Sequence, residues 1–401
     1  MISLNEANNI IQKSTKSIGI ETIPFLEAHG RILAQDIIST TDLPPFDRAT
    51  VDGFALQSQN VQSASKANPK TLSIIDVVQA GKPSLKEIKN GQAIKIMTGG
   101  VVPRGADCVV MKENTILESK VVKVFKAVKP GDSIAFCGDD IKKGNVILGH
   151  GMRLTPACTA LLASLGIGMV KVYKKPRVAI LVTGNELLNL KDKLKPGKIR
   201  SANQYGLSCQ IKEVGGEPTI LGIARDNLKE TGEKVSQGLK YDMLIISGGV
   251  SVGDYDLVPQ VLKERGVRFM IEKVAMQPGK PLIFGKKAKT YIFGLPGNPV
   301  STMVCFYEFV RPCLLNMQGA HKTVLNNAYA VLEEDLKFKP QRTKILRGVT
   351  SYRDRKIFVR RTTHQGSGNI ISLAKANCLF KVPEGITRLK KGSAVEIEYL
   401  P

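Results

Sequence analysis

From residue 173 onward, nearly continuous apolar runs alternate with amphipathic segments, and this alternation constrains the fold more than any other feature. The runs include RVAILVT (177–183), DMLIISGG (242–249) and YIFGLP (291–296). Strands that are apolar on both faces are typical of a parallel sheet with helices on both sides. Residues 173–318 are therefore predicted to form a three-layer α/β domain with a mainly parallel sheet.

The rest of the chain has a different pattern of apolar runs and turn-forming residues. Residues 42–138 carry short β-type runs separated by Gly, Pro and Asn, which predicts a small β-rich domain. The flanking residues 1–41 and 139–172 contain helical patterns and are predicted to form one helical or mixed domain around that insertion. Residues 319–401 return to short β-like runs and predict a small separate β domain. A chain of 401 residues is long enough for two to four domains.

Two helix starts are marked clearly. Ser3 and Glu6 have the spacing of a capping box before an apolar stripe, which predicts a helix over residues 3–14. Asn298 and Pro299 precede a long apolar stretch and are expected to cap and begin a helix that ends near residue 315.

Composition limits the classes of function. The net charge is 58 − 35 = +23, which either gathers anionic ligands or reflects a generally basic proteome. The lysines are scattered, only 5% of residues are aromatic and tryptophan is absent, so nucleic-acid binding is not expected.

The seven cysteines contain no CxxC pair, so neither a zinc site nor a disulfide framework is expected. Met1 opens directly onto the first helix without a signal peptide, and no apolar run approaches a membrane span. A cytoplasmic protein without membrane contact is predicted.

Three polar, glycine-rich loops follow the predicted parallel strands, at residues 183–186, 247–256 and 295–299. Ligands of open α/β sheets bind beyond the carboxyl ends of the strands, where such loops meet. Glycine lets backbone N–H groups approach an anion, and a following helix N-terminus adds a positive dipole. A phosphate or oxyanion site is predicted there, with ordinary turn formation as the alternative.

Acidic residues belong to the same edge: Glu186, Asp226, Asp254 and Asp256. Carboxylates without neighbouring His or Cys suit Mg²⁺ better than Zn²⁺. A single loop aspartate is more often a cap or turn former, so the metal hypothesis depends on their convergence.

Two further segments carry charged side chains beside prolines and glycines. The rigid turn at 278–281 presents the ammonium of Lys280, which suits a phosphate or another oxyanion. The segment PPFDRATVDGFA places Asp47, Arg48 and Asp52 among prolines and glycine; a plain polar loop is the alternative.

Familiar enzyme motifs are absent or incomplete. No GxxxxGK precedes Ser or Thr, and no GxGxxG follows a strand. The string at 249–253 matches the GxSxG elbow around Ser251, but the later histidines, His321 and His364, lie beyond the α/β region. A serine hydrolase is therefore not expected.

Short motifs along nearly the whole chain resemble the molybdopterin molybdenumtransferases, a family related to the C-terminal domain of gephyrin. The motifs are TVDGFA (50–55), IMTGG (96–100), GADCVV (105–110), GDDI (138–141), TGNEL (183–187), SGGVSVGDYD (247–256), QPGKP (277–281) and GLPGNPVS (294–301).

This resemblance implies an elongated homodimer of four-domain chains, each ending in a small β barrel. It implies a reaction in which adenylylated molybdopterin and molybdate bind, Mg²⁺-dependent hydrolysis releases AMP, and molybdenum remains on the dithiolene. A molybdopterin adenylyltransferase, the source of the adenylylated substrate, is a candidate partner.

The resemblance also implies roles for individual residues. Glu186, Asp256, Lys280 and Asp52 would be catalytic, and Glu186, Asp226 and Asp256 would hold the metal. The substrate-binding residues would be Thr98, Asp140, Ser247, Gly248, Gly249, Ser251, Pro296, Gly297, Asn298 and Pro299. Asp52, Thr98 and Asp140 would reach the cleft from the other subunit.

The chain departs from the family pattern at two positions. Gln277 stands where relatives often have a basic residue. Asn185 stands where they often have aspartate, so Glu186 is expected to be the main catalytic carboxylate of this loop. A molybdopterin adenylyltransferase and a gephyrin-like scaffold without turnover are the alternative functions. The extra domains argue against the first, and Glu186, Asp256 and Lys280 together argue against the second.

Overall fold

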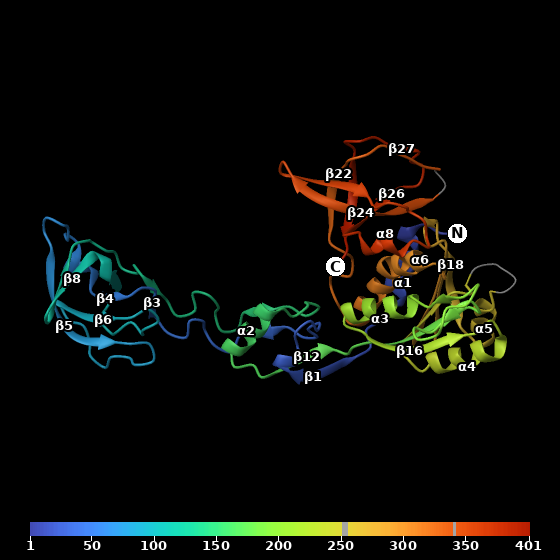
Figure 1. The fold of residues 1–401 in the computed structure, drawn as a ribbon. Helices are drawn as coiled ribbons and strands as arrows, with labels where there is room; N and C mark the ends of the chain where they lie inside the picture. The colour runs from blue at the N-terminus through green and yellow to red at the C-terminus, as the bar shows by residue number, and fades with distance from the viewer. Residues whose placement is uncertain (251–255, 340–341) are drawn as a thin grey trace. The chain divides into compact units, whose positions relative to one another are not determined.

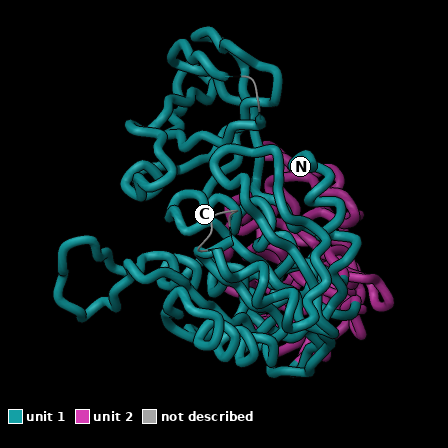
Figure 2. The backbone as a smooth tube through the Cα atoms, turned by 90° about the vertical axis from the view of Figure 1, so that its right-hand side faces the viewer, with its two compact units in different colours: residues 1–35, 150–159, 168–401 teal, residues 36–149, 160–167 magenta. Residues whose placement is uncertain are grey.

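The chain forms two compact units in the computed structural model, which describes residues 1–250, 256–339 and 342–401 (Figures 1 and 2). One unit comprises residues 1–35, 150–159 and 168–401, and the other comprises 36–149 and 160–167. Ser251 and Asp254, both singled out from the sequence, lie outside the described residues. The four-domain division stays a prediction.

The first unit is built around a six-stranded sheet. Its strands, in spatial order, are β16 (Glu217–Ala224), β13 (Arg177–Thr183), β17 (Met243–Ser247), β21 (Thr290–Leu295), β20 (Pro281–Lys287) and β18 (Arg268–Lys273). The first four are mutually parallel, and β20 runs antiparallel to both neighbours. The predicted mainly parallel sheet is confirmed.

Helices cover both faces of this sheet because its strands alternate apolar side chains to either side. Ile180 of β13 belongs to the core cluster shared with helices α1, α3, α6 and α7. Its neighbour Leu181 belongs to a second cluster shared with α4 and α5. The helices are α1 (Leu4–Ser14), α3 (Asn203–Glu213), α4 (Leu228–Gly238), α5 (Val258–Glu264), α6 (Pro299–Cys305) and α7 (Arg311–Met317).

The first helix starts as predicted. Ser3 N–H donates to Glu6 Oε2 at 2.8 Å, and Glu6 N–H donates to Ser3 Oγ at 3.2 Å, which completes the capping box.

The long helix after the last parallel strand differs from expectation in two ways. A π-helical segment, η4 (Phe306–Val310), separates α6 from α7. Pro312 accounts for it, because proline has no N–H for the carbonyl of Glu308 one α-turn earlier. Asn298 occupies the cap position, but its side chain makes no capping bond, since Val300 N–H donates to the Ser367 carbonyl at 3.1 Å.

The C-terminal region is a closed barrel, as the resemblance implied. Strands β24 and β26 pair with each other and so close the sheet. Around the barrel the strands are β24 (Thr343–Arg353), β25 (Lys356–Arg361), β22 (Asn327–Leu332), β28 (Ala394–Tyr399) and β26 (Cys378–Val382).

One short strand connects the α/β region to this barrel. β19 (Met276–Gln277), just before the turn at 278–281, pairs in parallel with the start of β24. The remaining short elements of the unit are β1 (Ile20–Pro24), η1 (Phe25–Glu27), β12 (Met169–Tyr173), β14 (Leu187–Leu188), β15 (Ile199–Arg200), β23 (Leu336–Lys337), α8 (Ile370–Ala374) and β27 (Arg388–Leu389).

The second unit is mostly β structure, as predicted for residues 42–138. Its main sheet has the order β7 (Cys108–Met111), β4 (Gly53–Leu56), β6 (Gln92–Ile96), β5 (Lys70–Val78), β9 (Val121–Val124) and β8 (Thr115–Glu118). Smaller elements are β2 (Ile37–Ile38), β3 (Arg48–Ala49), η2 (Ser58–Val61), η3 (Lys112–Asn114), β10 (Ile134–Ala135) and β11 (Val146–Leu148). Helix α2 (Pro156–Ser164) contributes residues to both units.

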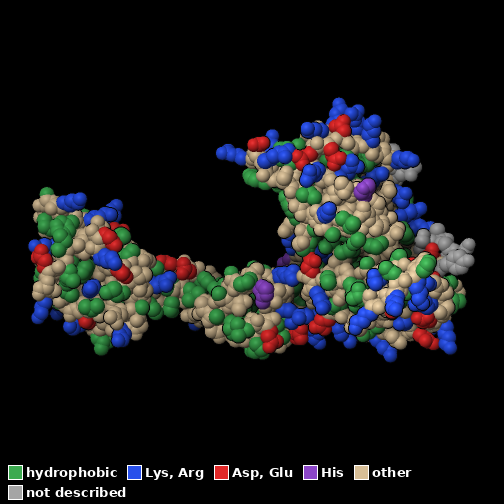
Figure 3. Space-filling view, viewed as in Figure 1, with side chains coloured by type: hydrophobic (Ala, Val, Ile, Leu, Met, Phe, Trp, Pro, Cys, Tyr) green, Lys and Arg blue, Asp and Glu red, His purple; other side chains and the backbone are tan. Residues whose placement is uncertain are grey.

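On the face drawn in Figure 3, the basic side chains do not form a single stripe. Figure 3 shows lysine and arginine side chains spread over one face of both units, with acidic side chains between them. Among the described residues, no helix combines the length and the apolar character needed to span a bilayer.

Candidate functional site

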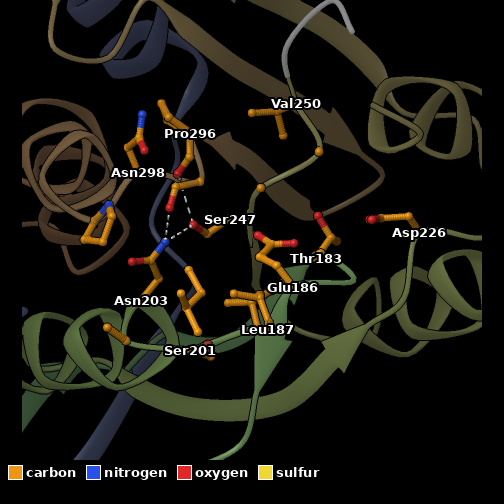
Figure 4. A pocket seen from close by; sticks show the side chains of 18 of the residues that line it. Thr183, Glu186, Leu187, Ser201, Asn203, Asp226, Ser247, Val250, Pro296 and Asn298 are labelled. Atoms are coloured by element: carbon orange, nitrogen blue, oxygen red, sulfur yellow. Dashed lines mark hydrogen bonds between the residues drawn. The ribbon is translucent and has the colours of Figure 1, made fainter. Parts of the chain in front are cut away.

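A cavity of about 500 Å³ lies at the carboxyl edge of the parallel sheet (Figure 4). The loops that follow β13, β16, β17 and β21 line it, and the start of α3 completes the wall. Ten residues predicted from the sequence meet there: Glu186, Asp226, Ser247, Gly248, Gly249, Asp256, Pro296, Gly297, Asn298 and Pro299.

The amide of Asn203, near the start of α3, ties two of these loops together. Its Nδ2 donates to Ser247 Oγ and to the Gly297 carbonyl, both at 2.8 Å, as Figure 4 shows for Ser247. Ser247 Oγ in turn donates to the Pro296 carbonyl at 3.1 Å. These bonds fix the loop after β17 against the loop after β21.

Two glycines allow the close approach of neighbouring loops. Gly248 and Gly249 have φ values of +99° and +63°, in the left-handed region. A Cβ on Gly248 would lie 2.6 Å from the Thr183 carbonyl oxygen. Any larger residue would therefore push the loop after β17 away from the loop after β13.

The carboxylate of Glu186 is exposed and folds back over Gly184. A Cβ on Gly184, whose φ is +148°, would lie 2.3 Å from Glu186 Oε2. On the adjoining loop, Asp226 Oδ2 accepts the Asn185 N–H at 3.0 Å. The two neighbouring loops thus bring Glu186 and Asp226 to one cavity, and Asp256 reaches it from the start of the segment before α5.

These carboxylates do not form a preassembled metal cage. Within residues 1–250, 256–339 and 342–401, no three His, Cys, Asp or Glu side chains lie close enough to hold a metal ion. Mg²⁺ is usually held by one or two carboxylates together with water and substrate phosphates. Glu186 and Asp256 on the cavity wall fit that kind of site, and Asp226 already gives one oxygen to a backbone N–H.

Lys280 does not lie on the wall of this cavity, although the sequence suggested it would. The turn at 278–281 directs it to a second cavity, of about 410 Å³, between the α/β region and the barrel. Pro281 lines both cavities, so the two adjoin.

The second cavity is strongly basic. Its described wall has no acidic side chain and carries Lys280, Lys337, Arg342, Lys344, Arg347 and Arg361. Arg347, on β24, is 1% exposed, and burial lowers its pKa to about 10. Its guanidinium donates to Ser372 Oγ and to the Gly366 carbonyl, both at 3.1 Å. Within the part of the chain that the structure describes, no carboxylate offsets this buried charge, so the cavity is suited to an anionic ligand.

The three remaining predicted residues lie in the second unit. Thr98 donates to Asp52 Oδ1 from its N–H at 2.9 Å and from its hydroxyl at 2.8 Å. The backbone hydrogen bond from Thr98 is the largest cause that lowers the pKa of Asp52. Asp140 is exposed, and its N–H donates to the Leu43 carbonyl at 2.9 Å. Their participation in the cavities of the first unit stays a prediction.

Sequence reasoning missed Asn203 and Arg347. Nothing in the spacing of Asn203 along the sequence indicates the bonds it makes. Arg347 offered a signal, since strand alternation places it on the same side as the buried Ile345. An arginine on the apolar face of a barrel strand indicates a buried cation.

Three family models match successive parts of the chain. Residues 2–166 match the MoeA N-terminal region (domains I and II). Residues 179–316 match a probable molybdopterin-binding domain, and residues 329–400 match the MoeA C-terminal region (domain IV).

Curated relatives and solved structures agree with these matches. The chain is 35% identical over 397 residues to the molybdopterin molybdenumtransferase of Staphylococcus epidermidis, covering 99% of this chain and 95% of that protein. The Bacillus subtilis enzyme of the same name is 36% identical over 405 residues, covering 99% and 93%. A crystal structure of the molybdopterin biosynthesis moeA protein from Pyrococcus horikoshii matches with a TM-score of 0.87 and 32% identity over 100% of both chains. The chain therefore belongs to the molybdopterin molybdenumtransferase family.

Proposed function

We propose that this protein transfers molybdenum from molybdate to the dithiolene of molybdopterin, in the biosynthesis of the molybdenum cofactor. The observation that carries the proposal is the pair of adjoining cavities that share Pro281. One is lined by glycine-rich loops and carboxylates, and the other by cations. A reaction between an adenylylated pterin and an oxyanion requires two such environments side by side.

The first cavity would hold adenylylated molybdopterin. Gly248 and Gly249 leave backbone close to the ligand, and the loop at 295–299 leads directly into a long helix. Both features suit phosphate groups. The tie from Asn203 to Ser247 and Gly297 would keep these loops in place when the ligand enters.

Mg²⁺ would be held by Glu186 and Asp256 together with substrate phosphate oxygens. When bound, the ion would offset the charge that develops as the phosphoric anhydride is cleaved. The chain's own contribution is to bring these two carboxylates to one cavity together with the glycine-rich backbone of residues 248–249.

Molybdate would bind in the basic cavity. It is a compact dianion, and Arg347 supplies a buried guanidinium while Lys280 supplies a movable ammonium. Because the two cavities adjoin at Pro281, molybdate would be held next to the pterin before the adenylate is cleaved. Holding both reactants together supplies much of the rate of such a step.

The protein would act as a homodimer, with Asp52, Thr98 and Asp140 completing the cleft from the partner subunit. The matches to the N- and C-terminal regions disfavour the adenylyltransferase alternative, because that activity needs only the central domain.

The test is to supply adenylylated molybdopterin, Mg²⁺ and molybdate, and to measure AMP and active cofactor. Glu186→Gln and Asp256→Asn should each reduce molybdate-dependent AMP release by ~100-fold or more, as expected when a charge-stabilising group is lost. Glu217→Gln, an exposed glutamate at the opposite end of the sheet, is the matched control and should retain activity.

Normal turnover by both cavity variants would disprove this location of the active site. Formation of adenylate from molybdopterin and Mg-ATP without molybdate would instead identify an adenylyltransferase. Absence of any turnover by the unmodified protein would favour the alternative function of a gephyrin-like scaffold.

A further inference from the structure

The loop that carries Glu186 is fixed by one arginine from the neighbouring strand end. Arg225 Nη1 lies 2.9 Å from the Leu187 carbonyl oxygen and 3.3 Å from that of Asn185. It also lies 3.5 Å from the carbonyl oxygen of Gly184. We propose that Arg225 is a positioning residue for Glu186, acting through the backbone of residues 184–187.

The convergence of three carbonyl oxygens explains why a cation is needed there. Carbonyl dipoles that point at one place repel each other unless a donor lies between them. A charged donor makes stronger hydrogen bonds than a neutral one, and a guanidinium is a charged donor. The guanidinium therefore adds to the backbone bonds of the loop, such as Leu187 N–H to the Gly184 carbonyl at 3.4 Å and Ile199 N–H to the Glu186 carbonyl at 2.9 Å.

The residue next to Arg225 holds the same loop from a second side. Asp226 Oδ2 accepts the Asn185 N–H at 3.0 Å, and the Asp226 N–H donates to Asn185 Oδ1 at 3.2 Å. Lys198 makes a third contact to this loop, because its Nζ donates to the Asn185 carbonyl at 2.7 Å. Arg225 is the only one of these three that reaches the carbonyls on both sides of Glu186.

The direction of the Glu186 carboxylate depends on this loop. Gly184 adopts a φ of +148°, and the carboxylate folds back over it. Without Arg225 the carbonyls of Gly184 and Leu187 would lose their side-chain donor, and the loop could shift about the contacts that remain, among them Ile199 N–H to the Glu186 carbonyl at 2.9 Å. The carboxylate would then leave the cavity wall without any change in its chemistry.

This inference rests on the proposed catalytic role of Glu186, and the experiment separates the two. The variants are Arg225→Met, Arg225→Lys, Glu186→Gln and the double variant Arg225→Met/Glu186→Gln, all in the full-length protein. Arg225→Met should lower kcat for AMP release by roughly ten- to a hundredfold with little change in KM, as misplacement by about 1 Å does. Arg225→Lys should recover most of that loss, because one nitrogen makes all three contacts.

The double variant gives the decisive reading. If Arg225 acts only through Glu186, adding Arg225→Met to Glu186→Gln causes no further loss of kcat. If the two residues act independently, the fold-losses in kcat of the two single variants multiply. Arg177→Met is the matched control: Arg177 lies at the opposite end of β13 and pairs with Asp242 at 3.1 Å. It should leave kcat unchanged.

Three results would overturn the proposal. The first is a kcat for Arg225→Met equal to that of Arg177→Met. The second is a multiplied loss in the double variant, which would show that Arg225 acts independently of Glu186. The third is full activity of Glu186→Gln, which would instead refute the proposed catalytic role on which the inference rests.

Discussion

At the scale of single residues, Arg347 departs furthest from what a protein core usually tolerates. It is the largest side chain among the fully buried ones, and it bonds to a hydroxyl and a carbonyl rather than to a carboxylate. Burying a cation without an ion partner costs stability unless a ligand supplies the missing charge. Molybdate bound as proposed above would supply that charge.

This gives a prediction in which binding and stability move in opposite directions. Arg347→Met should raise the KM for molybdate by about tenfold or more, the loss expected for a charged hydrogen bond. Its melting temperature without molybdate should be unchanged or higher, because methionine removes a buried charge. Calorimetry and steady-state kinetics would measure the two effects.

Arg388→Met is a suitable control, since Arg388 is an exposed arginine of the C-terminal region, on β27, and pairs with Asp335 at 3.0 Å. It should change neither quantity much. Unchanged molybdate kinetics in Arg347→Met would show that the basic cavity does not bind molybdate.

At the scale of elements, the π-helical segment η4 carries a carboxyl group that is almost fully buried, that of Glu308. Glu308 is 4% exposed, and its Oε2 lies 3.0 Å from Lys381 Nζ on β26. Lys381 also contacts Glu398 Oε1 on β28 at 2.7 Å. Burial outweighs the attraction of Lys381, and it raises the pKa of Glu308 to about 8.

The raised pKa makes stability depend on pH in a definite direction. In the unfolded chain Glu308 loses its proton near its ordinary pKa of 4.5, but in the folded protein only near 8. The folded state therefore binds more protons between these values, and the free energy of unfolding falls as pH rises through that window. Below pH 4.5 the contribution of Glu308 is fully present, and above about 8 it is lost.

Glu308→Gln should remove this component. Urea unfolding from pH 5 to 9 should give a smaller loss of stability for the variant than for the unmodified protein. Glu334→Gln, which alters a more exposed pair with Arg361, is the control and should follow the unmodified protein over this range. Identical pH profiles for Glu308→Gln and the unmodified protein would contradict the assignment.

At the scale of the whole molecule, the net charge of +23 has two explanations, and measurements at different salt concentrations distinguish them. If the field gathers molybdate, kcat/KM for molybdate should fall several-fold between low salt and about 0.3 M NaCl, as screening shortens the Debye length to under 10 Å. If the charge is only background, the rate with dilute molybdate should not change. Kinetics at constant Mg²⁺, with Arg347→Met as the comparison, would decide between them.

The sequence predicted much of this architecture because its signals are local. The apolar strands of residues 173–318, the capping box at Ser3 and the glycine-rich loops after the strands all depend on short-range chemistry. They identified the α/β sheet and most of the wall of the first cavity.

What the sequence did not predict depends on contacts between distant segments. Lys280 was expected beside Glu186, but the turn that carries it faces the barrel. The side chain of Asn298 makes no capping bond, and Val300 N–H donates instead to the carbonyl of Ser367, which is almost 70 residues away. Neither outcome is encoded in the spacing of nearby residues.

The pairing of β19 with β24 has a consequence for how the basic cavity receives its ligand. The ladder joins the segment just before Lys280 to the strand that carries Arg347. The backbone segments that carry the two cations therefore belong to one hydrogen-bonded scaffold, while the ammonium of Lys280 stays on a flexible side chain. If molybdate binds in this cavity as proposed, the scaffold would limit the backbone rearrangement that binding requires.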